Sequence, residues 1–226
     1  METGLERPIR GSAAPLALSL GERVEALHAA AVELARRPRR PRRERLSGLH
    51  NPWGHGDALV DPWLLLDLCE DPAILDAVEA LIGPDIVLWD TELFLEAATY
   101  QRFVEEGREG RYWPAMPLLG AVALVPAGEP ARDVTCVDLA QIGQKSLPPL
   151  DSHAPLYVVR YMPATSHFVR DGRALANWVA MEEQPLINYT TRPLWLVRGE
   201  DRAGNDFVTG FSPPVPRWAG NQPKEK

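Results

Sequence analysis

Cysteine, histidine and long apolar runs are scarce in this sequence of 226 residues. Its two cysteines, Cys69 and Cys136, lie far apart and outside any C-x-x-C spacing. Neither a zinc knuckle nor a disulfide framework is therefore indicated, and both residues are expected to be buried thiols. No segment approaches the run of about 20 apolar residues that a membrane span requires, and the apolar stretch near the N-terminus is too short for the core of a signal peptide. We expect a cytoplasmic protein without a membrane partner.

The familiar catalytic signatures are missing as well. There is no G-x-S-x-G element, no P-loop and no dinucleotide-binding fingerprint. A formal net charge of -7 does not suit a nucleic-acid-binding protein. The expected partner is a small-molecule ligand or substrate, and a homodimer or a complex with a homologue is left open.

What the sequence does contain predicts one domain, mainly β, with flanking helices. A hydrophobic content of 45% is enough for one sizeable core. Ser19 and Glu22 form a capping-box pattern ahead of apolar residues at helical spacing, and Asp71-Pro72 predicts a second helix that ends at Ile82. Between these helices, the arginine and proline run at 36–43 is expected to be an exposed loop. The predicted strands are short apolar runs at 86–95, 118–125, 134–139, 156–162 and 194–197.

Four local patterns, in order, resemble the phytanoyl-CoA dioxygenase-like family of jelly-roll oxygenases. They are ALIGPDI at 80–86, FVEEGREGRYW at 103–113, VRYMPATSH at 159–167 and NYTTRPLWLVRGED at 188–201. Each is weak alone, but their order and spacing carry the resemblance, which covers residues 46–211. It implies a double-stranded β-helix, or jelly roll, with helices along one side.

The resemblance also implies oxidation by Fe(II), O2 and 2-oxoglutarate, with iron held by two histidines and one carboxylate. The family's V-x-W-H-x-D pattern places its proximal ligands at Gly107 and Glu109, where an extended strand would direct both side chains to one side. Glycine supplies no ligand atom. The distal ligand position falls within 181–183, with Glu183 the residue chosen here, and no histidine is present there. The resemblance therefore implies a degenerate metal site that holds no metal.

Other residues offer alternatives to this interpretation. His50, His55 and His153 are candidate ligands for a working dioxygenase that uses Fe(II) and 2-oxoglutarate through non-standard residues. His167 is expected to be a packing or hydrogen-bonding residue. An all-carboxylate site formed by Glu109, Glu182 and Glu183 would suit magnesium or calcium better than redox iron.

The resemblance further suggests residues that line a pocket. Arg192 and Arg198 stand where the family has arginines, and a planar guanidinium suits a carboxylate ligand. The alternative for both is an ion pair at a strand end. Asn188 and the aromatic residues Tyr112, Trp113, Tyr161 and Trp195 are candidates for the barrel mouth, although aromatic residues at such places are commonly core.

The sequence therefore predicts three regions and one preferred function. Residues 1–45 form an N-terminal helix and an exposed arginine-rich segment, residues 46–215 form the jelly roll, and residues 216–226 form a polar tail. The preferred function is binding of a small organic metabolite, or a non-redox step that uses Glu109, in the former active-site pocket. No cofactor is expected. A working dioxygenase and a non-catalytic partner of an intact homologue are the alternatives.

Overall fold

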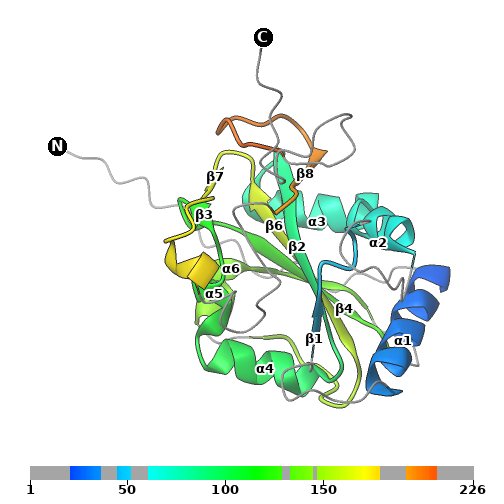
Figure 1. The fold of residues 1–226 in the computed structure, drawn as a ribbon. Coiled ribbons are helices and arrows are strands. Elements are labelled where there is room, and N and C mark those ends of the chain that lie inside the picture. Colours follow the sequence, from blue (N-terminus) through cyan, green and yellow to red (C-terminus); the bar gives the residue numbers. More distant parts are fainter. Residues whose placement is uncertain are drawn as a thin grey trace, which may run out of the picture.

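A computed structural model describes residues 21–36, 45–51, 61–128, 133–144, 147–178 and 192–207. Its helices are α1 (Gly21–Arg36), α2 (Pro62–Cys69), α3 (Pro72–Ile82), α4 (Ala97–Glu105), α5 (Arg108–Arg111) and α6 (Leu139–Gly143). Its strands are β1 (Arg45–Ser47), β2 (Ile86–Phe94), β3 (Ala115–Met116), β4 (Ala121–Pro126), β5 (Thr135–Asp138), β6 (Leu156–Pro163), β7 (His167–Phe168) and β8 (Trp195–Arg198). Figure 1 shows this arrangement.

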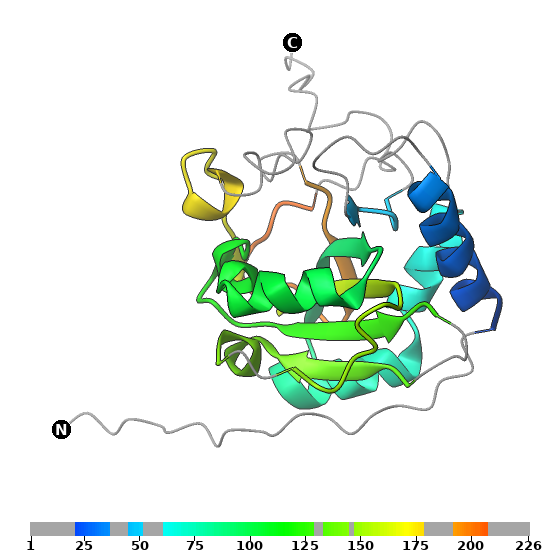
Figure 2. The same cartoon turned by 90° about the horizontal axis from the view of Figure 1, so that it is seen from below.

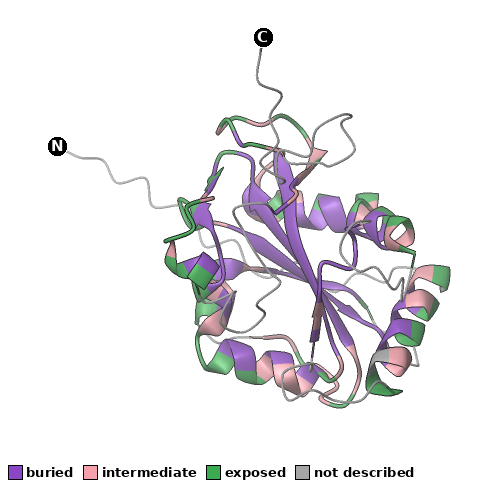
Figure 3. Ribbon diagram, viewed as in Figure 1, coloured by how far each residue is buried: buried purple, intermediate pink, exposed green. Residues whose placement is uncertain are grey.

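The strands form one large and one small antiparallel sheet. The large sheet has the order β1-β2-β6-β4-β5, with β8 also paired to β2, and the small sheet joins β3 to β7. The prediction of a mainly β jelly roll with flanking helices is confirmed. β2 and β6 lie at the centre and are buried along their whole length, as the purple ribbons of Figure 3 show.

Helices cover both faces of the large sheet (Figure 2). The helices α1, α2 and α3 pack on one face, the outer face, in a cluster that includes Tyr157, Val159 and Tyr161 of β6. The helices α4 and α6 pack on the opposite face together with Ala115 and Phe168 of the small sheet. Because it lies between the two sheets, we name this second face the inner face. It is the interior of the jelly roll.

The residues at the two ends of α3 explain where this predicted helix begins and ends. α3 runs from Pro72 to Ile82, and the Asp71 side chain accepts a hydrogen bond of 3.0 Å from the backbone N–H of Ala73. Gly83 ends the helix at a φ of 96°, a conformation that favours glycine. α1 was also predicted, and its residues Val24 and Leu27 are buried in the core. Ser19 of its capping box and most of the arginine run lie outside the described residues.

The segment aligned with the family's iron-binding strand has a different structure. Residues 97–111 form α4 and α5, joined by Gly107 at a φ of 69°. The expectation that an extended strand places Gly107 and Glu109 on one side is therefore wrong. The physical reason is local: apolar Tyr100, Phe103 and Val104 recur at helical spacing and are buried against the inner face.

Two further features concern the N-terminal region and the length of the helices. The first strand begins at Arg45, and α1 packs against the same core as the sheet. No helix in the described part of the chain is long and apolar enough to cross a membrane.

Candidate functional site

β2 places two carboxylates on the inner face beside the centre of the sheet. Leu88 pairs with Tyr161 and Asp90 pairs with Arg160, so Trp89 forms a bulge with no residue opposite it. The bulge directs Asp90 toward the inner face, directly across from Arg160. Glu92 follows two residues later and points to the same side because side chains alternate along a strand.

Arg160 is the centre of a buried ion-pair network. Its Nε and Nη2 donate to Glu109 Oε1 and Oε2 at 2.6 and 2.9 Å. Its Nη1 donates to Asp90 Oδ2 at 3.2 Å, and its Nη2 lies 2.9 Å from Glu92 Oε2. Burial alone disfavours its charge, but the charges of Glu109 and Glu92 outweigh burial and raise the pKa of Arg160 well above its usual value. Arg160 is therefore charged.

Two more arginines complete this network. Arg45 Nε lies 3.4 Å from Glu92 Oε1, and its Nη2 donates to the Tyr112 hydroxyl at 2.6 Å. Arg192 forms an ion pair with Asp90. Burial lowers the pKa of Arg192 to about 10, so it remains charged at neutral pH. Three carboxylates and three guanidinium groups thus form one buried set, which we call the arginine network: Asp90, Glu92, Glu109, Arg45, Arg160 and Arg192.

Arg192 also fills a gap between two strands. One edge of β2 pairs with β8 at Ile86–Leu88 and with β1 from Glu92 onward. In the gap between them, Arg192 Nε donates to the Trp89 carbonyl at 3.4 Å and its Nη2 donates to Ser47 Oγ at 3.2 Å. The guanidinium therefore binds both the backbone of β2 and a side chain of β1.

Aromatic rings close the network on its helical side. Trp113 Nε1 donates to Glu109 Oε1 at 3.0 Å, and the Trp113 ring meets Trp89 edge to face with centroids 5.1 Å apart. A side chain at Gly120 would overlap the Trp113 ring, so only glycine fits there without rearrangement. Tyr112 and Trp113 are both buried, which places them in the core beside Glu109.

Among the other predicted site residues that the structure describes, Arg198 does not join the network. Arg198 instead lies on the α3 side, where its Nη1 is 2.8 Å from both Asp76 Oδ1 and Glu79 Oε2. It forms ion pairs at the end of β8 and does not line an inner pocket. Asn188 and Glu183 lie outside the described residues, as does Glu182.

The aromatic candidates Tyr161 and Trp195 are not at an inner pocket either. Tyr161 belongs to the outer-face cluster, where its hydroxyl donates to the Cys69 carbonyl at 2.8 Å. Trp195 packs against the same cluster and donates from Nε1 to Asn51 Oδ1 at 3.2 Å. Cys69 and Cys136 are buried free thiols, as predicted.

The described histidines are not placed to complete an iron site with Glu109. His50 is buried, and its Nδ1 lies 2.8 Å from Thr91 Oγ1. Thr91 stands between Asp90 and Glu92 on β2, so its side chain points to the outer face. Burial first, and then the charge of Arg192, hold the pKa of His50 well below its usual value. His153 and His167 are exposed. Of the packing or hydrogen-bonding role expected for His167, the packing part is therefore wrong. His55 lies outside the described residues.

These donors do not fit the facial triad that the family resemblance implies. A facial triad needs imidazole nitrogens and a carboxylate with free lone pairs, whereas both Glu109 oxygens accept hydrogen bonds from Arg160. Among the described residues, no three His, Cys, Asp or Glu side chains are grouped to hold a metal ion. A divalent cation beside Glu109 would also meet the positive charge of Arg160.

A cavity lies on the inner face, away from the arginine network. It has a volume of about 240 Å³ and is formed by the start of α4, strands β4, β5 and β6, and the loop that precedes β6. Its lining is mostly apolar. The lining residues are Ala97, Leu124, Pro126, Asp133, Thr135, Pro148, Pro149, Leu150, Asp151, Ala154, Pro155 and Leu156.

Sequence reasoning missed the centre of the network, although a signal was present. Arg160 interrupts the otherwise apolar run at 156–162, and Asp90 and Glu92 interrupt the run at 86–95. Charged residues within a strand that is buried on both faces must be paired, because burying an isolated charge is too costly. Matching these charges with one another would have found the core of the network.

Comparisons with known proteins bear on the fold. No family profile and no curated protein matches the chain. Among solved structures, CytC3 aligns with a TM-score of 0.51 and 16% identity over 87% of this chain and 88% of that one. A structure titled CytC3 with Fe(II) and alpha-ketoglutarate aligns with a TM-score of 0.47 and 17% identity over 86% of each chain. The nickel complex of the non-heme monooxygenase ThoJ aligns with a TM-score of 0.45 and 19% identity over 87% of this chain and 84% of that one. The first alignment shows that this chain shares the jelly-roll fold of CytC3.

Proposed function

We propose that this chain is a small-molecule-binding protein built on an oxygenase jelly roll, in which the arginine network replaces the iron chemistry of phytanoyl-CoA dioxygenase-like proteins. One observation carries the proposal. Glu109, the residue that the resemblance aligns with an iron ligand, is 1% exposed and is held by Arg160 through two hydrogen bonds. Arg160 thus supplies the positive charge beside Glu109 that a metal ion would supply in a relative.

The energetics support this replacement. Removing one partner from a buried ion pair costs about 3–5 kcal/mol, because the other charge is left without compensation. Iron binding at Glu109 would have to displace Arg160, which also contacts Asp90 and Glu92. Metal binding would therefore disrupt three buried ion pairs at once.

Binding is favoured over a catalytic role for Glu109. A general base needs a lone pair that can reach a substrate proton, and both Glu109 oxygens already accept hydrogen bonds from Arg160, with a further one from Trp113 at Oε1. The inner face around Glu109 is filled by these side chains. A metabolite site therefore belongs elsewhere on the molecule, outside the former iron position.

The proposal is tested by titrating the purified protein with Fe(II) under argon and following bound metal by equilibrium dialysis, with and without 2-oxoglutarate. We expect no stoichiometric site and no decarboxylation of 2-oxoglutarate coupled to oxidation. A Glu109→Gln variant should behave as the parent does. A stoichiometric Fe(II) site that EDTA removes and that supports turnover would contradict the proposal and favour the alternative of a working dioxygenase.

A further inference from the structure

His50 is a buried histidine with one ring nitrogen left without a hydrogen bond. It follows β1 in the sequence, and its side chain is fully buried. Its Nδ1 lies 2.8 Å from Thr91 Oγ1, whereas its Nε2 has no hydrogen-bond partner within the described chain. A neutral imidazole needs only one acceptor, but a protonated ring needs two. A proton added to His50 would therefore be buried without a second acceptor.

Arg192 is the charged group that faces His50. Its Nη2 donates to Ser47 Oγ at 3.2 Å, and a side chain added at Gly48 would lie 3.6 Å from the same nitrogen. Arg192 keeps its charge, because burial lowers its pKa only to about 10. Burial first, and then this charge, hold the pKa of His50 well below its usual value. A second positive charge in this place would be repelled by the first.

The other titratable groups that the structure describes around His50 do not compensate for a positive charge on its ring. The Tyr157 hydroxyl of β6 faces Thr91, and the Cys69 thiol at the end of α2 faces Tyr157. Burial raises the pKa of both groups, so both are neutral in acid and at neutral pH. The charged groups that β1, β2, β8 and α1 contribute here are engaged in ion pairs of their own, and they are Arg45, Asp90, Glu92, Arg198 and Arg23.

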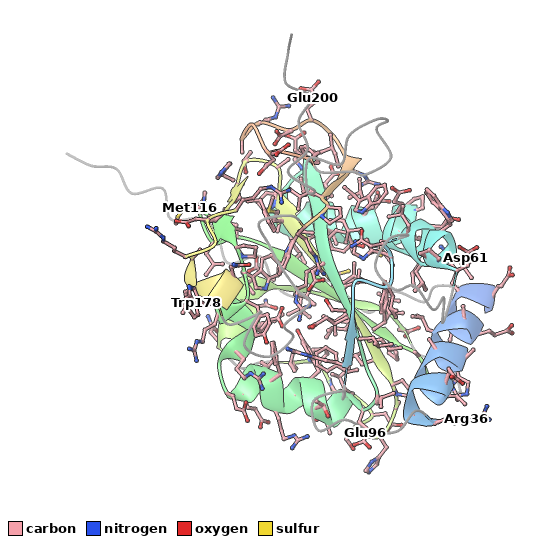
Figure 4. The ribbon with its side chains drawn as sticks, in the orientation of Figure 1. Arg36, Asp61, Glu96, Met116, Trp178 and Glu200 are labelled. Carbon is pink, nitrogen blue, oxygen red and sulfur yellow. The ribbon has the colours of Figure 1, made fainter. Side chains whose placement is uncertain are left out.

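The segment that carries His50 can open without breaking the centre of the large sheet. β1 has three residues and pairs with β2 at the edge of the sheet, and Figure 4 shows this short blue strand alongside β2. Gly48 turns the chain after β1 at a φ of 73°, and its N–H donates to the Thr91 carbonyl at 2.6 Å. Such a short edge segment opens at a lower free energy than the whole fold.

From this geometry we propose that residues 45–51 form an acid-sensitive latch, in which protonation of His50 opens the segment and separates it from Arg192. An exposed histidine has an ordinary pKa of about 6.5, so the closed latch is fully favoured above this pH and is lost progressively below it. Opening withdraws Ser47 from Arg192 and from Asp90. The latch therefore makes access to one side of the arginine network depend on pH.

The test measures amide hydrogen exchange of the full chain by NMR between about pH 7.5 and 5, expressed as protection factors that correct for the intrinsic effect of pH. Below about pH 6.5, the protection factors of Gly48 and Asn51 should fall by about tenfold per pH unit. They should not change in dilute urea, because a local opening exposes little surface. The β6 amides of Val159 and Tyr161 should stay at least about tenfold better protected at every pH.

Two results would overturn the latch. Protection factors of Gly48 and Asn51 that stay constant with pH would show that His50 does not control the segment. Protection factors equal to those of Val159 and Tyr161, with the same dependence on urea, would show that the segment opens only when the whole protein unfolds.

Variants test the imidazole itself. His50→Gln keeps a polar side chain beside Thr91 but cannot gain a proton, so it should remove the dependence of the Gly48 and Asn51 protection factors on pH. His153→Gln, at an exposed histidine, is the matched control and should keep it. An unchanged dependence in His50→Gln would overturn the proposal.

The parent protein decides the question even where His50→Gln does not fold. The His50 ring resonances should report a neutral imidazole until the Gly48 and Asn51 amides lose protection, and the two transitions should coincide. Titration of His50 near pH 6.5 while these amides stay protected would overturn the proposal.

Discussion

Glu109 and Arg160, 51 residues apart in the sequence, are joined by two parallel hydrogen bonds in the interior of the jelly roll. This fork geometry is the arrangement in which a guanidinium group binds a carboxylate most strongly. Because both residues are only about 1% exposed at the side chain, solvent does little to screen the pair. The pair ties α5 to the centre of the large sheet.

The first prediction concerns this pair. Arg160→Met should lower the free energy of unfolding by about 3–5 kcal/mol or more, because it leaves three buried carboxylates without their common partner. Glu109→Gln should cost less, because Arg160 keeps its contacts with Asp90 and Glu92. Urea denaturation monitored by tryptophan fluorescence measures both. Arg198→Met, which removes a partly exposed ion pair, is the control and should cost about 1 kcal/mol or less. Equal effects of Arg160→Met and Arg198→Met would disprove the central role of Arg160.

The second prediction concerns the contact of Gly120 with Trp113. Gly120→Ala would place a methyl group within the Trp113 ring, so the ring must move and its hydrogen bond to Glu109 is disturbed. We expect a loss of about 1–3 kcal/mol, typical of overpacking, together with a changed near-ultraviolet circular dichroism spectrum. Gly143→Ala is the matched control, because a side chain there meets no atom within 4 Å. A Gly120→Ala protein as stable as Gly143→Ala would contradict this packing.

The third prediction concerns the dependence of stability on pH through His50. Burial and Arg192 lower the pKa of His50, so the folded protein keeps it neutral while the unfolded chain takes up a proton below about pH 6.5. The unfolded state then binds more protons, and the free energy of unfolding should fall as the pH drops through this value. His50→Gln should remove this part of the slope, measured by urea denaturation at several pH values. Exposed His153→Gln should keep it, and parallel slopes for the parent and His50→Gln would show that His50 does not contribute.

The fourth prediction concerns Asp85, which anchors the segment after β8. Its Oδ2 accepts a hydrogen bond from Arg202 Nε at 2.5 Å, and its Oδ1 accepts one from the Glu200 N–H at 2.9 Å. The hydrogen bond from Arg202 first, and then that from Glu200, lower the pKa of Asp85. The anchor should be fully present above the ordinary aspartate pKa of about 3.9 and weaken as the pH falls below it.

Replacing this carboxylate should loosen the same segment at neutral pH. Asp85→Asn should speed hydrogen exchange at Glu200 and Arg202, measured by mass spectrometry of peptides from this region, while amides of β6 stay protected. Asp67→Asn serves as the control. Unchanged exchange in Asp85→Asn would mean that other contacts hold the segment.

Much of the fold could be predicted from the sequence because its signals are local. Asp71-Pro72 and Gly83 mark both ends of α3, and the apolar run at 86–95 gives nearly the bounds of β2. β1 was not predicted, because three residues that include Arg45 and Ser47 carry no strand pattern of their own. Its place is set by pairing with β2 and by the contacts of Arg45 across the inner face.

The candidate site was harder to predict because it depends on contacts between distant residues. The resemblance singled out Glu109, Arg192, Tyr112 and Trp113, and the structure brings all four to the arginine network. It could not supply Arg160, which lies outside the aligned ligand positions. The cavity was also missed, because its lining comes from four separate segments and proline-rich loops such as 147–155 appear in sequence only as connections.

One edge of β2 pairs with β8 and β1 and contacts Arg192 in the gap between them, and this has a consequence for how the chain folds. Asp90 accepts a hydrogen bond from Arg160, which lies 70 residues later in the sequence. Ser47 donates to Asp90 and accepts from Arg192, which lies 145 residues after Ser47. Contacts between such distant residues form slowly, because long loops must close first. Until Arg192 arrives, the Trp89 carbonyl and one side of Asp90 lack this partner. During synthesis, the interior of the jelly roll is therefore completed only after Arg192 has left the ribosome.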